Sequence, residues 1–218
     1  MYLHYAYDLW AHHWRQHQAH GDMVIVRYAD DAVAGFENED DAKRFLKDLQ
    51  GRLSRFELEL NRDKTVLVEF RQQKRGERRR KERQRSRAFT FLGLEHYWGR
   101  TTTRRPVLVR RTEPQRMRAT LKAIKIALRR RRHDAVPEQG EWLGSLLRGY
   151  FNYYAVPTNV RMLSRFRTEV IRLWRRQLQQ RSQRTCLNWR RMNRLSLRWL
   201  PPAKARHPWP QRRFHART

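Results

Sequence analysis

Two short apolar runs bracket a pair of neighbouring acids near the start of the chain. Residues 23–26 lead in and residues 32–36 lead out, so mostly apolar side chains flank Asp30-Asp31. Runs of this kind favour strands, and the short stretch between them leaves room only for a tight turn. The sequence therefore predicts a β-hairpin with Tyr28-Ala29-Asp30-Asp31 at its tip.

The acidic pair at this tip has two interpretations. Two adjacent carboxylates repel each other, and a shared cation relieves that repulsion. Carboxylate oxygens suit Mg²⁺, which proteins hold by one or two carboxylates while substrate phosphates complete the shell. Asp30 and Asp31 are thus predicted metal ligands of a nucleotidyl-transfer site, where two ions clamp the attacking and leaving oxygens. The alternative is a solvated turn without a ligand.

The formal charge of the chain is +29, and it is distributed unevenly. Residues 1–70 hold 9 basic and 13 acidic side chains, whereas residues 104–218 hold 30 and 5. Such cationic density repels itself unless a polyanion screens it, and the predominant Arg suits phosphate oxygens and bases. Nucleic acid is the predicted partner, with binding that weakens steeply with salt. Non-specific stickiness and an acidic membrane surface are the alternatives.

Other classes of site have weaker support. Cys186, the only cysteine, excludes an internal disulfide and a cysteine-rich zinc site. His13, His17 and His20 could share one helical face, but no ligand is placed to complete a tetrahedron, so a surface helix is favoured. No apolar run approaches the ~20 residues of a membrane span, and no signal-peptide pattern opens the chain. We expect a cytoplasmic protein that binds no membrane.

Hydrophobic periodicity predicts an α+β fold, with helices laid on an antiparallel sheet. The expected elements of the first part are a helix at 2–17, the hairpin, a helix from 39 to about 56 with Asn38 as N-cap, and a strand pair at 58–60 and 65–70. Residues 71–87 hold ten Lys or Arg among seventeen and are predicted to be a basic loop, either phosphate-contacting or simply solvated.

Strand-like patterns continue at 88–95 and 106–110, and helical ones follow. Apolar stripes within 117–128, 142–154, 163–173 and 187–200 predict a small bundle of helices with a cationic exterior. Such a surface suits single-stranded or looped RNA, through phosphate contact and stacking. The RNA-binding candidates are Lys122, Lys125, Arg129, Arg130, Arg131, Arg132, Arg148, Asn152 and Tyr153. For Tyr150 and Tyr154, core packing is the favoured interpretation.

The order of these features resembles the second half of a bacterial-type group II intron-encoded reverse transcriptase and maturase. The tip motif is followed by Leu58-Glu59-Leu60-Asn61 with Lys64-Thr65, by Phe89-Thr90-Phe91-Leu92-Gly93, and by the basic helices. Residues 137–140, 142–143, 148–157 and 207–210 resemble that family's maturase region, called domain X or the thumb. The similarity covers nearly the whole chain. Glu57 departs from it, because the family usually has glycine there.

The resemblance implies a domain plan: a partial right-hand polymerase palm followed by an all-α thumb. Its parts are the C-terminal part of the palm (1–70), the basic loop (71–87), the end of the palm (88–112), the domain X bundle (113–200) and a tail (201–218). It also implies roles. The residues that carry them are Asp30 and Asp31 as Mg²⁺ ligands, Tyr28 at the nucleotide and primer end, Lys64 as the acid that protonates pyrophosphate, and Phe91, Leu92 and Gly93 as the primer-gripping loop.

The family pattern also implies what this chain lacks. A third metal-binding aspartate and the template-binding fingers would precede residue 1. Asp22 lies roughly 25 Å from the turn along its strand, and Asp8 sits on a helix with no reason to face the site. We therefore expect an N-terminally truncated chain with an incomplete two-ion Mg²⁺ site and little polymerase activity of its own.

The expected partner is group II intron RNA, bound to assist splicing and mobility, with a DNA target or primer as a partner of the full-length family. The leading alternative is a stand-alone RNA-binding splicing factor with a vestigial palm. A DNA-binding protein of a mobile element and a fragment that does not fold alone are weaker alternatives. The sequence does not reveal the oligomeric state.

Overall fold

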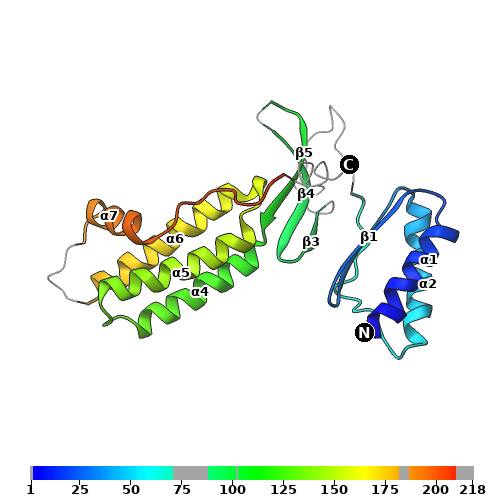
Figure 1. Cartoon of the computed structure of the whole chain (residues 1–218), viewed down its shortest axis with the longest axis horizontal. Coiled ribbons are helices and arrows are strands. Elements are labelled where there is room, and N and C mark those ends of the chain that lie inside the picture. The colour runs from blue at the N-terminus through cyan, green and yellow to red at the C-terminus, as the bar shows by residue number, and fades with distance from the viewer. Residues whose placement is uncertain (1, 71–87, 102, 182–186, 210–218) are drawn as a thin grey trace. The chain divides into compact units, whose positions relative to one another are not determined.

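A computed structural model describes residues 2–70, 88–101, 103–181 and 187–209. The described residues up to Glu69 form one compact unit, and Phe70 together with the residues from Ala88 onward forms a second. Each unit combines helices with antiparallel strands (Figure 1). The predicted α+β fold class is therefore confirmed. The basic loop predicted at 71–87 lies outside the described residues.

The first unit contains the predicted hairpin. A π-helical turn, η1 (His4–Asp8), runs into α1 (Leu9–His17), which is followed by β1 (Met23–Tyr28), β2 (Asp31–Phe36) and α2 (Glu39–Ser54). β1 and β2 pair antiparallel, from Met23 opposite Phe36 to Tyr28 opposite Asp31. The hairpin loop is therefore the two residues Ala29 and Asp30, as the apolar runs on either side predict.

The core of the first unit lies between the helices and one face of the hairpin. Trp14 from α1 meets Phe45 from α2 edge-on, with ring centroids 5.1 Å apart, and Phe36 from β2 at 6.1 Å. The buried side chains of this core are Tyr7, Ala11, Trp14, Met23, Phe45, Leu49 and Leu53. The opposite face of β1 stays open, since Val24 and Tyr28 are 63% and 66% exposed.

Two local predictions for the first unit need correction. The strand pair expected at 58–60 and 65–70 is wrong, because the structure assigns no strand to residues 58–70. Val66 is 70% exposed, so its β-branched side chain has no sheet to join. Asn38 occupies the N-cap position of α2 as predicted, but its side chain makes no capping hydrogen bond. Glu57 has a φ of 55°, a conformation that explains a glycine preference at this place.

The second unit begins with a three-stranded antiparallel sheet of β3 (Phe89–Phe91), β4 (Leu94–Arg100) and β5 (Pro106–Thr112), in that order. The strand-like segment expected at 88–95 breaks at Leu92-Gly93. Both residues have positive φ, 50° and 72°, the combination that a type I′ hairpin turn requires. A Cβ on Gly93 would lie 2.9 Å from the hydroxyl of Tyr154, so glycine also serves close packing here.

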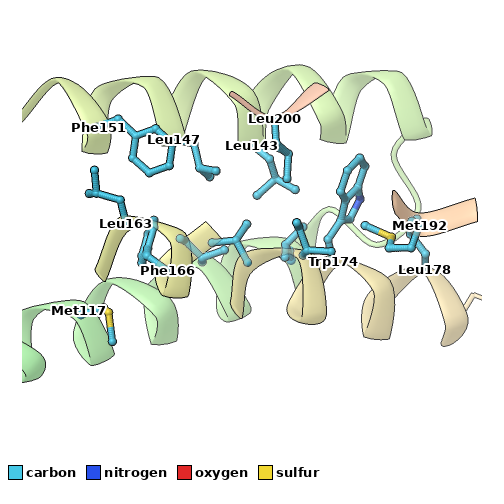
Figure 2. Close-up of a cluster of buried hydrophobic side chains, with 14 of the residues drawn as sticks. Met117, Leu143, Leu147, Phe151, Leu163, Phe166, Trp174, Leu178, Met192 and Leu200 are labelled. Carbon is cyan, nitrogen blue, oxygen red and sulfur yellow. The ribbon is translucent and has the colours of Figure 1, made fainter. Parts of the chain in front are cut away.

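Four α-helices follow the sheet. They are α4 (Pro114–Arg130), α5 (Val136–Tyr154), α6 (Val160–Gln179) and α7 (Trp189–Trp199), with a short 3-10 helix, η2 (Pro157–Asn159), before α6. Pro137 lies in the first turn of α5, where a missing N–H is harmless, so this helix starts earlier than its apolar stripe suggests. Figure 2 shows the apolar side chains of these helices meeting in one core, in which Trp174 is fully buried near Met192 and Leu178.

The sheet and the helices of the second unit are joined through η2. The hydroxyl of Thr158 accepts a hydrogen bond from the amide of Arg110 at 2.8 Å and donates one to the carbonyl of Arg110 at 3.0 Å. It thereby satisfies backbone groups of β5 in the way that a neighbouring strand would. After α7 the chain returns along the bundle, and the amides of Arg206 and His207 donate to the carbonyl of Ala155 at the end of α5. None of the described helices is long and apolar enough to cross a bilayer.

Candidate metal and nucleic-acid site

The acid turn lies at the exposed tip of the β1–β2 hairpin. Asp30 occupies the second loop position and Asp31 begins β2, and both are exposed. Ala29, the first loop residue, has a φ of 53°, which a residue with a Cβ adopts at some cost. The acidic pair thus lies at the hairpin tip, as the sequence predicts, on a strained backbone segment that exposes both carboxylates to solvent.

Arg27 and Asp8 brace this turn from within the first unit. Nε and Nη2 of Arg27 donate to the two carboxylate oxygens of Asp8 at 2.6 and 2.5 Å. The third guanidinium nitrogen, Nη1, donates to the carbonyl of Ala29 at 2.7 Å. The hydrogen bond from Arg27 lowers the pKa of Asp8, and the same bond raises the pKa of Arg27. Asp8 is thus linked to the turn only through Arg27, and among the described residues no hydrogen bond or ion pair joins its carboxylate to Asp30 or Asp31.

A signal for this brace was present in the sequence. Strand residues alternate between faces, so Arg27 shares the covered face of β1 with Met23 and Ile25. A cation on the face that packs against a helix requires a carboxylate from that helix. Asp8 is the only acid in residues 2–17, and it meets that requirement.

The donor set of the turn suits a hard divalent cation. Asp30 and Asp31 offer carboxylate oxygens, the ligands that Mg²⁺ prefers. Within residues 2–70 and the other described ranges, no group of three or more His, Cys, Asp or Glu side chains is placed to hold a metal. An ion here would be held by Asp30 and Asp31 and would need further oxygens, such as those of phosphates. Bound there, it would supply charge stabilisation for phosphate chemistry.

The other predicted polymerase residues are distributed over both units. Tyr28 lies on the open face of β1, next to the turn in sequence. Lys64 lies in a turn that Asn61 closes by accepting hydrogen bonds from the amides of residues 63 and 64, and its side chain is exposed. No hydrogen bond or ion pair between described residues joins Lys64 to the acid turn.

The loop predicted to grip a primer belongs to the second unit, where it forms the β3–β4 turn. The carbonyl of Leu92 accepts a hydrogen bond from the hydroxyl of Tyr153 at 2.9 Å, and the carbonyl of Gly93 accepts one from the amide of Glu113 at 3.0 Å. Phe91 pairs with Leu94 across the turn. The helices thus hold this turn in a fixed conformation.

The RNA-binding candidates divide into two groups in the structure. Five are exposed and form no ion pair with any described residue: Lys122, Lys125, Arg129, Arg130 and Arg148. The other four make contacts within the second unit. Arg131 lies 5.2 Å over the ring of Trp142, and Arg132 donates to Gln177 and Gln180.

Asn152 and Tyr153 complete the second group. The side-chain oxygen of Asn152 accepts a hydrogen bond from Arg206, and its carbonyl bonds to Nε2 of His207 at 2.7 Å. Tyr153 is held by Leu92, although half of its side chain remains exposed. The neighbouring Tyr150 stacks on Phe166 at 3.8 Å, and burial raises its pKa to about 12. Core packing is thus confirmed for Tyr150.

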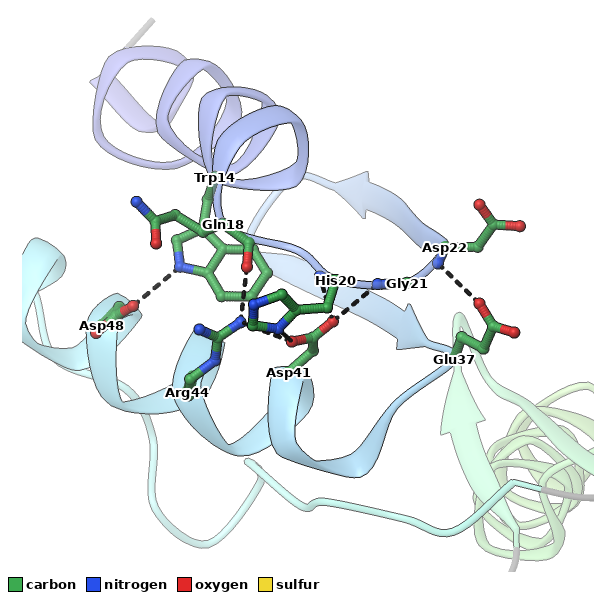
Figure 3. Close-up of polar contacts among 9 residues, drawn as sticks. All are labelled: Trp14, Gln18, His20, Gly21, Asp22, Glu37, Asp41, Arg44 and Asp48. Carbon is green, nitrogen blue, oxygen red and sulfur yellow. Dashed lines mark hydrogen bonds and ion pairs between the residues drawn. The ribbon is translucent and has the colours of Figure 1, made fainter.

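A buried carboxylate fixes the loop that leads into β1 (Figure 3). Asp41 accepts hydrogen bonds from the amides of His20 and Gly21 at 2.8 and 3.1 Å, and from Arg44 at 2.7 Å. Burial would raise the pKa of Asp41, but these hydrogen bonds outweigh it and lower the pKa to about 2. His20 is thereby engaged with Asp41, whereas the rings of His13 and His17 stack on each other at 4.1 Å.

Comparison with known proteins agrees with this geometry for the first part of the chain. Residues 1–96 match the family model described as "Reverse transcriptase (RNA-dependent DNA polymerase)". The matched stretch contains the whole first unit, with the acid turn, and reaches into β4. No curated protein matches the chain. Residues 1–96 are therefore similar to reverse transcriptases, a family that normally uses divalent metals and acts with nucleic acids.

Proposed function

We propose that the chain is a nucleic-acid-binding part of a group II intron reverse transcriptase and maturase. The observation that carries the proposal is the coincidence of the reverse-transcriptase match with a hairpin whose tip presents Asp30 and Asp31. In this proposal the first unit is palm, and its acid turn holds Mg²⁺ against the phosphates of a growing strand. The second unit combines the primer-gripping turn with the thumb.

Charge supports an RNA-binding role for the second unit. The region from residue 104 onward carries 30 of the 50 basic residues. Lys122, Lys125 and Arg129 lie exposed along α4, at spacings that place cationic side chains on one side of a helix. Intron RNA, with its loops and closely packed phosphates, is the polyanion that this surface would bind during splicing.

Polymerisation by this chain alone is expected to be weak. Two-ion catalysis needs several ligands to hold the metal ions. The group II intron reverse transcriptases that the sequence resembles use a third metal-binding aspartate in addition to the acidic pair. In the part of the chain that the structure describes, two carboxylates stand at the turn. Binding of RNA does not depend on them and is expected to persist.

The test compares binding and chemistry in the same preparation of the full chain. RNA affinity is measured by fluorescence anisotropy over a range of salt, and Mg²⁺-dependent primer extension is measured on an RNA template. We expect RNA affinity that falls steeply with salt, unchanged in Asp30→Asn/Asp31→Asn. Affinity that does not vary with salt would contradict the nucleic-acid assignment, and strong primer extension would contradict the expected weak polymerisation.

The alternative of a splicing factor with a vestigial palm is supported by the second unit, which has a core of its own. Binding of Mn²⁺, a paramagnetic substitute for Mg²⁺, separates the two functions. If Asp30 and Asp31 hold an ion, Mn²⁺ broadens the amide resonances of the turn in the wild type and not in Asp30→Asn/Asp31→Asn. Uniform weak broadening in both would favour the vestigial palm.

A further inference from the structure

Helix α7 presents a surface that the predicted RNA-binding residues do not include. Its inner side packs on α5 and α6, with Met192 and Ser196 buried. Trp199 enters a notch on α5, where a Cβ on Gly140 would lie 2.5 Å from the indole. The notch fixes which side of α7 faces outward. We define the α7 face as the outward side chains Trp189, Arg190, Arg191, Arg194, Leu197 and Arg198, all of them exposed.

The arginines of the α7 face have no acidic partner in the structure. The chain contains no Asp or Glu after Glu169, and fourteen Lys or Arg follow that residue. Elsewhere in the second unit arginines do pair with carboxylates, as in Arg111–Glu95 and Arg172–Glu169 at 2.7 and 2.6 Å. Among described residues, no ion pair involves the four arginines of α7. Their charge is therefore available to an external anion.

Helix stability does not explain Arg190 and Arg191. Arg190 and Arg191 lie in the first turn of α7, which contains no acidic residue. The helix dipole disfavours cations at that end. The turn is instead stabilised by Asn188, whose side-chain oxygen accepts a hydrogen bond from the amide of Arg191 at 2.9 Å. Arginine at these positions opposes folding of the helix unless a polyanion is bound.

An aromatic ring lies at the same end of the α7 face. Trp189 is 46% exposed, and the guanidinium of Arg175 lies 4.5 Å from its ring centroid. Arg175 is itself held by a hydrogen bond from Nε to the carbonyl of Leu187 at 2.9 Å. The indole is thus fixed in place by a cation while part of it remains open. Sites for single-stranded nucleic acid combine an aromatic platform of this kind with a cationic track.

We propose that the α7 face binds single-stranded nucleic acid, with its arginines on the phosphates and Trp189 stacked on an unpaired base. The helix is about 16 Å long, enough to follow several nucleotides. A duplex would satisfy the arginines but not the indole, because its bases are already stacked and paired. The inference rests on the proposed function in that it presumes a nucleic-acid partner, and it assigns a second surface, separate from Lys122, Lys125 and Arg129 on α4.

The test uses the full chain and labelled poly(U) RNA, with a duplex of equal length as the competitor. Two variants address the α7 face: the first replaces its four arginines by Gln, and the second is Trp189→Ala. The matched control replaces four exposed cations of the first unit by Gln, namely Arg15, Lys47, Arg55 and Arg62. Circular dichroism verifies that each variant keeps the helix content of the wild type.

We expect the arginine variant to reduce the slope of log affinity against log salt by about 2.8, because each single-strand phosphate contact contributes about 0.7. Trp189→Ala should weaken RNA binding on the order of tenfold and leave duplex binding unchanged, and Trp189→Phe should restore most of the loss. The inference is overturned if the slope does not change, if the control variant loses as much, or if Trp189→Ala weakens duplex equally. If the wild-type chain shows no salt-dependent RNA binding, the proposed function itself is contradicted.

Discussion

Asn159 offers the sharpest test of how the second unit is held together. Its side chain is fully buried and makes three hydrogen bonds: its oxygen accepts from the amide of Thr112 at 2.8 Å, and its nitrogen donates to Thr112 Oγ1 at 2.7 Å and to the carbonyl of Tyr154 at 2.8 Å. Thr112 is also fully buried, so water does not replace these bonds. The residue therefore joins the end of β5 to the end of α5.

The expected effect of Asn159→Ala follows from the buried polar groups that the substitution leaves without a hydrogen-bond partner. Each buried polar group left without a partner costs about 1–3 kcal/mol. The substitution leaves the amide of Thr112 without a partner, whereas the carbonyl of Tyr154 keeps the hydrogen bond from the amide of Val156 at 2.8 Å and the Thr112 hydroxyl can rotate. We therefore expect the free energy of unfolding of the second unit to fall by about 1–3 kcal/mol.

The assay is a urea titration followed by far-ultraviolet circular dichroism, because most of the helix in the described residues belongs to the second unit. Hydrogen exchange of the β5 amides reports on the joint itself. Asn193→Ala is the matched control, an exposed asparagine on α7 whose loss should change stability by less than about 0.5 kcal/mol. A loss below about 1 kcal/mol in Asn159→Ala would refute the reasoning.

Three further predictions address the two turns and the buried acid. The pKa of Asp41 in the folded protein, about 2, lies below the ordinary value of about 3.9, so the ionised carboxylate stabilises the fold at pH above 3.9 and this contribution is lost as pH falls toward 2. Asp41→Asn should therefore reduce the pH dependence of the free energy of unfolding between about pH 3.9 and 2, measured by acid unfolding. Gly93→Ala should lower stability by about 1–3 kcal/mol in a urea titration, because of its positive φ and close neighbours, whereas Gly149→Ala, with open space around it, should be neutral or stabilising. Asp8→Asn should weaken Mn²⁺ broadening at the acid turn by releasing Arg27, and broadening equal to that of the wild type would count against the brace.

Elements set by local sequence pattern were predictable, and those set by distant partners were not. The hairpin at 23–36 follows from apolar runs around a short loop, and α2 follows from Phe45, Leu49 and Leu53 at helical spacing. Residues 58–70 carry the same strand-like composition, yet a strand needs a neighbour to pair with, and none of the described strands pairs with them. Composition alone does not reveal a missing partner.

The same distinction separates the candidate site residues. The positions of Asp30 and Asp31 at the tip were predictable, because two residues of loop leave no other geometry. The roles of Arg132 and Asn152 were not, because their partners, Gln177 and Arg206, lie 45 and 54 residues away in the sequence. A cation count therefore overestimates the number of side chains available to RNA.

The contacts of Arg27 bear most directly on what the acid turn can bind. In a chain with 50 Lys and Arg, an exposed acidic pair could be neutralised by a neighbouring cation, and Arg27 is the nearest one in sequence. Two guanidinium nitrogens of Arg27, Nε and Nη2, bind the carboxylate of Asp8, and the third, Nη1, donates to the carbonyl of Ala29 in the turn. Within the described ranges no ion pair reaches Asp30 or Asp31. The two carboxylates thus form no ion pair with a described side chain while their backbone is held in place, which supports the proposal that a divalent ion, rather than a side chain, is their partner.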